Sequence, residues 1–234
     1  ELRTAQPMLD LRVFRDLALT LNLIILALFF FGMFGHMLMF PFYLSTMRGF
    51  ETGLAGILLA LIFVGYGAGA PFAGRLVDRY GASVVQAGTL LLLVVGYALV
   101  MTLNLDTTPA GFVLRVMLMF VAIGSLQVAN NTAIMGAASQ EQLGVISGVL
   151  STARAVGQTL GVAGLGALWS ARVNFHSGAV VDTTTAAPLI QVQALNEMTL
   201  VALLAAALAL GLAIWEYVVT HGWKLPVRVI HPAD

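Results

Sequence analysis

The stretch from Gly65 to Gly81 reads GYGAGAPFAGRLVDRYG and joins a run of apolar residues to a short charged segment. In its first half, Gly65, Gly69 and Ala73 recur every four residues, so that small side chains share one face of a helix. Such a face lets a neighbouring helix approach backbone to backbone inside a membrane. In its second half, charged residues between two long hydrophobic runs predict a tight connection at 74–83.

The composition indicates that the rest of the chain is also built for lipid. Of the 234 residues, 59% are hydrophobic and 9% are charged, whereas a soluble domain has roughly 25% charged residues. The net charge of zero argues against nucleic acid as a partner, and the lack of cysteine excludes disulfides and thiolate chemistry. The chain starts at Glu1 without an initiator Met or a signal peptide, so we expect a fragment or a processed piece.

Six apolar segments are close to the ~20 residues that cross a bilayer. They lie at 17–44, 53–73, 84–103, 110–136, 145–170 and 197–219. We therefore predict an all-α polytopic membrane protein with six transmembrane helices in one bundle. Its parts are a juxtamembrane segment at 1–16, the bundle at 17–219 and a tail at 220–234. The segment 171–196 is expected to be an outer loop with at most a short helix.

The basic residues predict the orientation of these helices. An even number of spans puts both chain ends on one side of the membrane. That side would carry Arg3, Arg12, Arg15, Arg75, Arg79, Lys224 and Arg228, against Arg48 and Arg172 on the other. The positive-inside rule makes the first side cytoplasmic. We expect a multi-pass protein of the inner (cytoplasmic) membrane with both ends in the cytoplasm.

Two spans carry polar residues at helical spacing. Each set falls on one face of its helix: Gln127, Asn130 and Asn131 in the fourth span, and Ser147, Ser151, Arg154 and Gln158 in the fifth. Because an ionisable side chain is costly in hydrocarbon, Arg154 should face a cavity or a polar partner. The two stripes lie at similar depth, which favours a shared water-filled cavity; a hydrogen-bond cluster that only fixes packing is the alternative.

Other chemistry-bearing groups are sparse. His36 stands alone, which favours a packed or hydrogen-bonded histidine over a metal ligand. The many Phe and Met residues of the first span suit lipophilic ligands, but lipid contact or packing is the favoured interpretation. No paired acids, Ser–base pair or His motif lies within the spans, so we expect neither an enzyme nor a metal site.

The charged connection resembles the loop signature of the major facilitator superfamily, Gly-x-Leu-x-Asp-Arg-x-Gly with two following basic residues. The matching residues are Gly74, Leu76, Asp78, Arg79 and Gly81, while Ala82 and Ser83 replace the basic pair. The run from Gly144 to Gly161, with Arg154 inside it, resembles the penultimate span of EmrB/QacA-type fourteen-span drug:proton antiporters. The leader at 6–15 resembles the linker before a late span of the same proteins.

The resemblance implies the carboxy-terminal half of a proton-coupled multidrug exporter that works by alternating access. Its partners would be the lipid bilayer, the amino-terminal half, lipophilic or cationic small molecules and a periplasmic adaptor. A proton gradient would drive it without a cofactor, with coupling acids in the other half and a gating loop at Gly74, Asp78, Arg79 and Gly81. Alternatives are an exporter of a siderophore, lipid or sugar, or a non-transport subunit of a membrane complex.

Overall fold

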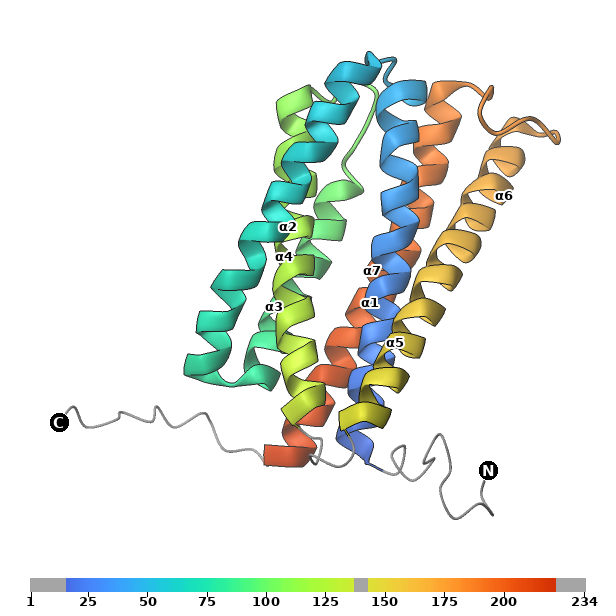
Figure 1. The fold of residues 1–234 in the computed structure, drawn as a ribbon. Helices are drawn as coiled ribbons and strands as arrows, with labels where there is room; N and C mark the ends of the chain where they lie inside the picture. Colours follow the sequence, from blue (N-terminus) through green and yellow to red (C-terminus); the bar gives the residue numbers. More distant parts are fainter. Residues whose placement is uncertain (1–15, 137–142, 222–234) are drawn as a thin grey trace.

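The computed structural model describes residues 16–136 and 143–221. These residues form a bundle of helices in which successive spans run in opposite directions, as Figure 1 shows, with no strand among them. The elements are α1 (Leu17–Phe42), the π-helical turn η2 (Tyr43–Met47), α2 (Thr52–Tyr80), α3 (Ala82–Val100), α4 (Pro109–Gly136), α5 (Leu143–Leu160), the π-helical turn η3 (Gly161–Leu165), α6 (Gly166–Ser177) and α7 (Pro188–His221). The all-α membrane fold is confirmed.

Five of the described helices are long and apolar enough to cross a membrane, where we expected six. They are Leu17–Met47, Thr52–Tyr80, Ala82–Val100, Pro109–Gly136 and Pro188–Thr220. The expected fifth span at 145–170 exists as the consecutive elements α5, η3 and α6, which run the height of the bundle beside α1. It falls outside the five because the polar stripe with Arg154 and Gln158 lowers its mean hydropathy.

The small-residue face of Gly65, Gly69 and Ala73 packs against another helix, as predicted. Gly65, Gly69 and Ala73 are buried, and a Cβ built on Gly69 would lie 2.4 Å from the carbonyl oxygen of Val121 in α4. The hydroxyl of Ser125 in α4 donates to the carbonyl of Gly69 at 3.1 Å. Helices α2 and α4 therefore meet backbone to backbone, a distance that only residues without bulky side chains permit.

The predicted connection at 74–83 is wrong in extent, because α2 continues to Tyr80. The chain turns at Gly81 alone, whose φ of 84° is a conformation that favours glycine, and α3 begins at Ala82. Gly74, Asp78 and Arg79 thus lie on the last turns of a helix of 29 residues, about 43 Å long at 1.5 Å per residue. That length exceeds the ~30 Å hydrocarbon core, so a charged end fits outside it.

The outer loop predicted at 171–196 is also shorter than expected. Helix α6 continues to Ser177 and ends at Gly178, which has a φ of 69°, and α7 begins at Pro188. Glu197 in α7 accepts hydrogen bonds from Arg172 and, at 2.9 Å, from His176 in α6. These contacts tie the end of α6 to the first turns of α7.

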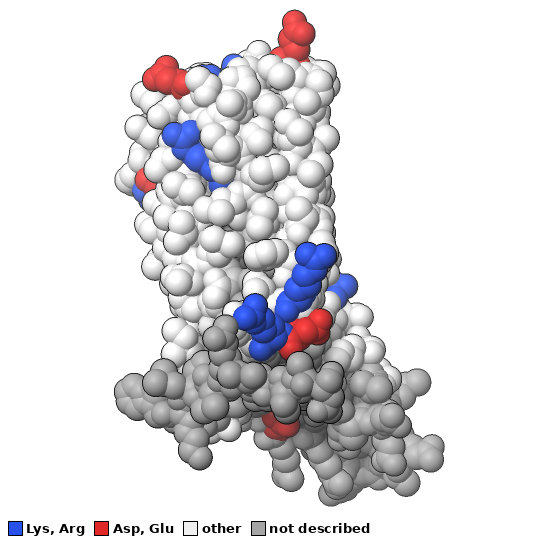
Figure 2. Space-filling view, turned by 90° about the vertical axis from the view of Figure 1, so that its left-hand side faces the viewer, with Lys and Arg blue, Asp and Glu red and all other residues white. Residues whose placement is uncertain are grey.

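The charged side chains are distributed as a membrane protein requires. Figure 2, which looks at the side formed by α2 and α3, shows them towards the two ends of the bundle with an uncharged band between. The predicted leader at 1–16 and tail at 220–234 lie almost wholly outside the described residues. So do Arg3, Arg12, Arg15, Lys224 and Arg228, on which the predicted orientation largely depends.

Candidate functional site

Helix α5 is held to the bundle through one face. Gly157 and Gly161 are buried against α1, where Cβ atoms built on them would lie 2.4 Å from the carbonyl oxygen of Ala27 and 2.3 Å from that of Phe31. Gly161 opens the π-helical turn η3, and Leu165 at its end lies against Gly35 of α1. The segment 143–177 therefore contacts α1 backbone to backbone at Gly157 and Gly161.

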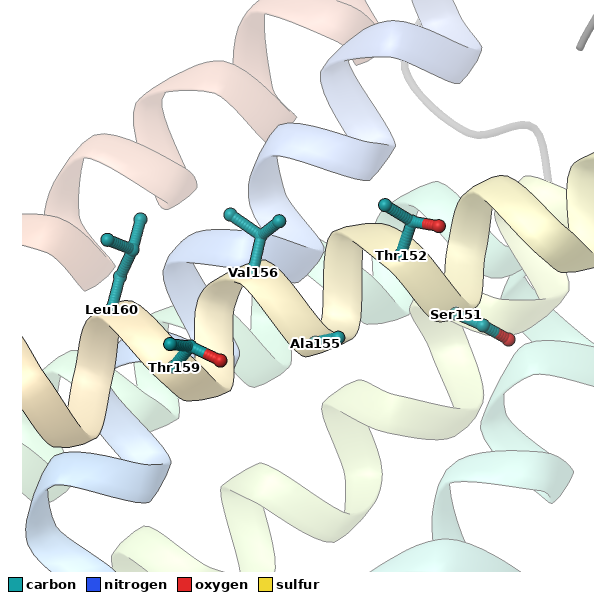
Figure 3. A pocket seen from close by; sticks show the side chains of 6 residues that line it. All are labelled: Ser151, Thr152, Ala155, Val156, Thr159 and Leu160. Atoms are coloured by element: carbon teal, nitrogen blue, oxygen red, sulfur yellow. The ribbon is translucent and has the colours of Figure 1, made fainter.

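The other side of α5 is exposed. A hollow of about 560 Å³ runs along it and is lined by residues of α5 alone among those described. Figure 3 shows the six lining side chains, which are small, branched or hydroxyl-bearing: Ser151, Thr152, Ala155, Val156, Thr159 and Leu160. All six are exposed. The hydroxyls of Ser151 and Thr152 donate to carbonyls of their own helix, those of Ser147 and Gly148, at 2.9 and 3.0 Å.

Arg154 lies at the edge of this face, half-buried against α1. Its guanidinium carbon is 5.3 Å from the centre of the Phe30 ring, a cation–π distance. Its Nε is buried and has no hydrogen-bond partner among the described residues. Tyr66 of α2 is within electrostatic range of the guanidinium. Arg154 is therefore a half-buried cation with an aromatic neighbour but no counter-ion in the described part of the chain.

The polar residues of α4 are engaged differently. The hydroxyl of Tyr66 donates to Gln127, which ties α2 to α4 close to the space that Arg154 faces. Asn131 is half-buried, and its Oδ1 has no partner among the described residues. Gln127, Asn131 and Arg154 therefore remain candidates for one polar region between α2, α4 and α5.

Asn130 does not belong to that region. It is 0% exposed, and its Nδ2 donates to the backbone carbonyl of Asn22 in α1 at 3.2 Å. The side chain of Asn22 in turn accepts from Gln86 of α3 at 2.8 Å. Through the backbone carbonyl and the side chain of Asn22, these bonds join α1, α3 and α4. In this arrangement Asn130 takes part in interhelical packing, and its place in a cavity stays a prediction.

The structure does not join the two predicted polar stripes by hydrogen bonds. No bond between Arg154 and Asn130 or Asn131 occurs in the described residues, since α5 packs on α1 while α4 packs on α2 and α3. Ser147 and Ser151 are exposed on α5, and Gln158 is half-buried.

Sequence reasoning missed four neighbours that now define the two sites: Tyr66, Phe30, Asn22 and Gln86. Asn22 and Gln86 carried a usable signal, because a lone amide inside an apolar span needs a partner in another helix. Tyr66 and Phe30 carried none, since aromatic residues are frequent throughout the chain.

The predicted gating residues lie together at one end of the bundle. Asp78 and Arg79 are exposed on the last turn of α2, and the guanidinium carbon of Arg79 is 5.3 Å from the ring centre of Tyr80. No salt bridge involves Asp78 within 16–136 and 143–221. Gly74 lies one turn earlier, half-buried with open space beside it, and Gly81 makes the turn into α3.

Comparison with known proteins gives one family and several related transporters. Residues 2–162 match the family described as the Major Facilitator Superfamily. The chain is similar to the multidrug resistance protein Stp of Mycobacterium tuberculosis, with 29% identity across 73% of this chain and 32% of the relative. It is also similar to the tetracenomycin C resistance and export protein of Streptomyces glaucescens, with 27% identity across 74% of this chain and 32% of the relative.

A third relative is the multidrug efflux pump LfrA of Mycolicibacterium smegmatis, at 24% identity across 79% of this chain and 38% of the pump. The matched region of this chain thus corresponds to about a third of the length of the curated relatives.

Proposed function

The chain belongs to the major facilitator superfamily, and on this premise we propose that it is one six-helix half of a proton-coupled multidrug efflux transporter. Family membership favours a transporter over an enzyme. The relatives named for drug resistance or export support a drug-like substrate. Lipophilic, often cationic compounds are the proposed cargo, and the proton gradient is the proposed driving force, with no cofactor.

The one-sided packing of α5 is the observation that carries this proposal. In transporters built from two bundles, the substrate site lies near the midplane where the bundles meet, and rocking of one bundle against the other exposes it to alternate sides. The α5 face beside Arg154 has the small apolar and hydroxyl side chains that suit such a site. We propose that the second, amino-terminal bundle faces it across the substrate path.

Arg154 has a defined role in this arrangement. A charged side chain at the centre of a membrane costs about 3 kcal/mol or more. We propose that a carboxylate of the amino-terminal half pairs with Arg154 when the two halves close, and that substrate or a proton displaces this pair. The planar guanidinium lying on Phe30 presents its donors in a fixed direction, which a lysine cannot reproduce.

Asp78 would close the cytoplasmic end of the substrate path. It is exposed at the end of α2 and lacks a salt bridge in the described residues, so it is available to a basic partner or to helix amides of the other half. Asp78→Asn in the intact transporter should cut turnover several-fold at normal membrane insertion, and Asp78→Glu should retain most of it. Equal efflux by wild type and Asp78→Asn would contradict this gating role.

The proposed setting is the inner membrane with both ends of the chain in the cytoplasm, and an adaptor in the periplasm is a further proposed partner. A siderophore, lipid or sugar as cargo would use the same fold. The dye and drug panels used to test the efflux proposal would reveal such a narrower substrate range.

The experiment is reconstitution of the protein into vesicles that are loaded with a cationic dye. A pH gradient is then imposed across the vesicle membrane. Vesicles that hold this chain together with an amino-terminal bundle should export the dye, and a protonophore should stop export. Vesicles that hold this chain alone should show insertion without export. Gradient-driven export by this chain alone would mean a homodimeric carrier and would overturn the half-transporter proposal.

A further inference from the structure

His36 is a buried titratable group that the proposed substrate path does not use. It lies in α1 with 0% exposure and contacts α7, which runs beside α1 in Figure 1. Its Nδ1 is 2.8 Å from the carbonyl oxygen of Gly32, and its Nε2 is 3.0 Å from the hydroxyl oxygen of Thr199. That hydroxyl oxygen also lies 2.7 Å from the carbonyl oxygen of Leu195.

These three contacts fix where the hydrogens can be. A carbonyl only accepts, so Nδ1 carries a hydrogen and donates it to Gly32. In the neutral ring Nε2 is then bare and accepts from the Thr199 hydroxyl. In the protonated ring Nε2–H donates to Thr199, whose hydroxyl hydrogen turns to Leu195. Rotation of a single hydroxyl hydrogen thus satisfies both protonation states without movement of a heavy atom.

The rings around His36 suit a transient positive charge. The ring centres of Tyr97 in α3 and Phe40 in α1 lie 5.0 and 5.6 Å from that of His36, within the range of cation–π contacts. The Tyr97 hydroxyl is buried without a hydrogen-bond partner among the described residues, and it lies against Gly32, where a Cβ would approach it to 2.3 Å.

The charged groups of the neighbouring elements are occupied elsewhere. Glu197 of α7 is bound to Arg172 and His176 of α6. Arg115 of α4 bonds Thr102 and the carbonyl of Gly111 near the outer end. Arg154 of α5 lies on Phe30, six residues or about 9 Å along α1.

The remaining titratable groups near His36 are few. Tyr97 is the one titratable side chain of α3, and the π-helical turn η3 has none. Glu216 of α7 is seventeen residues or about 25 Å from Thr199 along the helix. No described carboxylate therefore compensates a charge on His36 in this conformation.

We infer that His36 is a proton-binding site between α1 and α7, where uptake of a proton at Nε2 reverses the hydrogen bond with Thr199. Its use as a transport proton site rests on the proposed proton-coupled efflux. Because His36 is fully buried and has no counter-ion among the described residues, this conformation favours the neutral ring. Protonation then favours a conformation in which the α1–α7 contact admits water or a carboxylate, which couples proton binding to helix movement.

A direct test follows the titration of His36 by NMR of the intact protein with labelled histidine in nanodiscs. The chain has four histidines, and the His36 signal is the one lost in His36→Asn. It should change between about pH 4 and about pH 9. Thr199→Val should reduce the proton affinity of His36 about fivefold, because hydrogen bonds to charged groups are stronger than neutral ones by about 1 kcal/mol. Thr199→Ser keeps the hydroxyl and should behave as wild type.

Either of two outcomes would overturn the site. One is a His36 signal that is constant over this range, and the other is identical titration in Thr199→Val and Thr199→Ser.

The coupling role has a separate readout in vesicles that hold the complete transporter. In His36→Asn, the rate of gradient-driven export should fall at least about tenfold. In His176→Asn, at the predicted outer end, this rate should stay at the wild-type level. Gradient-driven export that is equal in His36→Asn and wild type would overturn the coupling role. Wild-type vesicles without gradient-driven export would instead contradict the proposed function, and the NMR titration would still decide whether His36 binds a proton.

Discussion

Helices α4 and α5 carry similar polar stripes but have different neighbours. Helix α4 is wedged between α2 and α3: a Cβ on its Gly124 would lie 2.1 Å from the carbonyl oxygen of Tyr66, and its Met119 meets Gly96. Helix α5 packs on α1 through Gly157 and Gly161 and exposes its other side. The same residue types therefore serve packing on α4 and remain available on α5.

The physical reason is the absence of water from the hydrocarbon core. A polar side chain there must find a partner inside the protein or face a water-filled space. Asn130 on α4 finds Asn22 at 3.2 Å. Arg154 on α5 finds an aromatic ring but no acceptor in the described residues. An unsatisfied polar group beside an exposed face thus marks function more reliably than a polar stripe does.

The largest expected effect tests whether α4 is wedged. Gly124→Leu should lower the stability of the folded bundle by about 3 kcal/mol or more, because the side chain would push against the backbone of α2. The measurement is thermal unfolding in detergent. The matched control is Gly88→Leu in α3, where a Cβ meets nothing within 4 Å. Equal stability of the two variants would mean that α2 and α4 separate easily.

The second prediction compares one arginine on each helix. Arg154→Ala should insert normally, but its rate of dye efflux per inserted protein should fall at least about tenfold. Arg154→Lys should also transport poorly, because an ammonium group does not reproduce the planar guanidinium. Arg115→Ala on α4 should retain efflux, because Arg115 donates its hydrogen bonds to the hydroxyl of Thr102 and the carbonyl of Gly111. Wild-type efflux from Arg154→Ala would reduce Arg154 to a packing residue and remove the functional distinction between the helices.

The third prediction concerns the amide cluster of α4. Asn130→Ala should destabilise the bundle by about 1 kcal/mol through loss of the bond to Asn22, with unchanged efflux per folded protein. Unfolding and efflux measured on the same preparation separate the two effects. Reduced efflux with unchanged stability would indicate that Asn130 lines the cavity.

The smallest expected change in stability belongs to the open face of α5. Ser151→Ala should alter stability by less than about 0.5 kcal/mol, because Ser151 is exposed and its hydroxyl donates to the carbonyl of Ser147 in its own helix. It should instead change the relative resistance to individual drugs in a panel. An unchanged resistance profile would argue that this part of α5 faces lipid.

Much of the fold was predictable because its causes are local in the chain. Lipid as solvent requires long apolar helices, so the spans follow from hydropathy, and small residues spaced by four predict the close contact of Gly65 and Gly69 with α4. The lengths of the connections between helices were harder to predict from the sequence. The charged residues before Gly81 suit a helix end outside the membrane as well as a loop, and a π-helical turn at Gly161–Leu165 leaves no composition signal.

The sequence by itself determined the membrane class, the approximate spans, the superfamily resemblance and the residues that lipid would not tolerate unpaired. The tertiary structure decided which of those residues are paired. It placed Asn130 beside Asn22 and His36 beside Thr199, across 108 and 163 residues of chain, and it left Arg154 on Phe30. Helical periodicity places a side chain on a face of its own helix, but what that face meets depends on how distant helices pack.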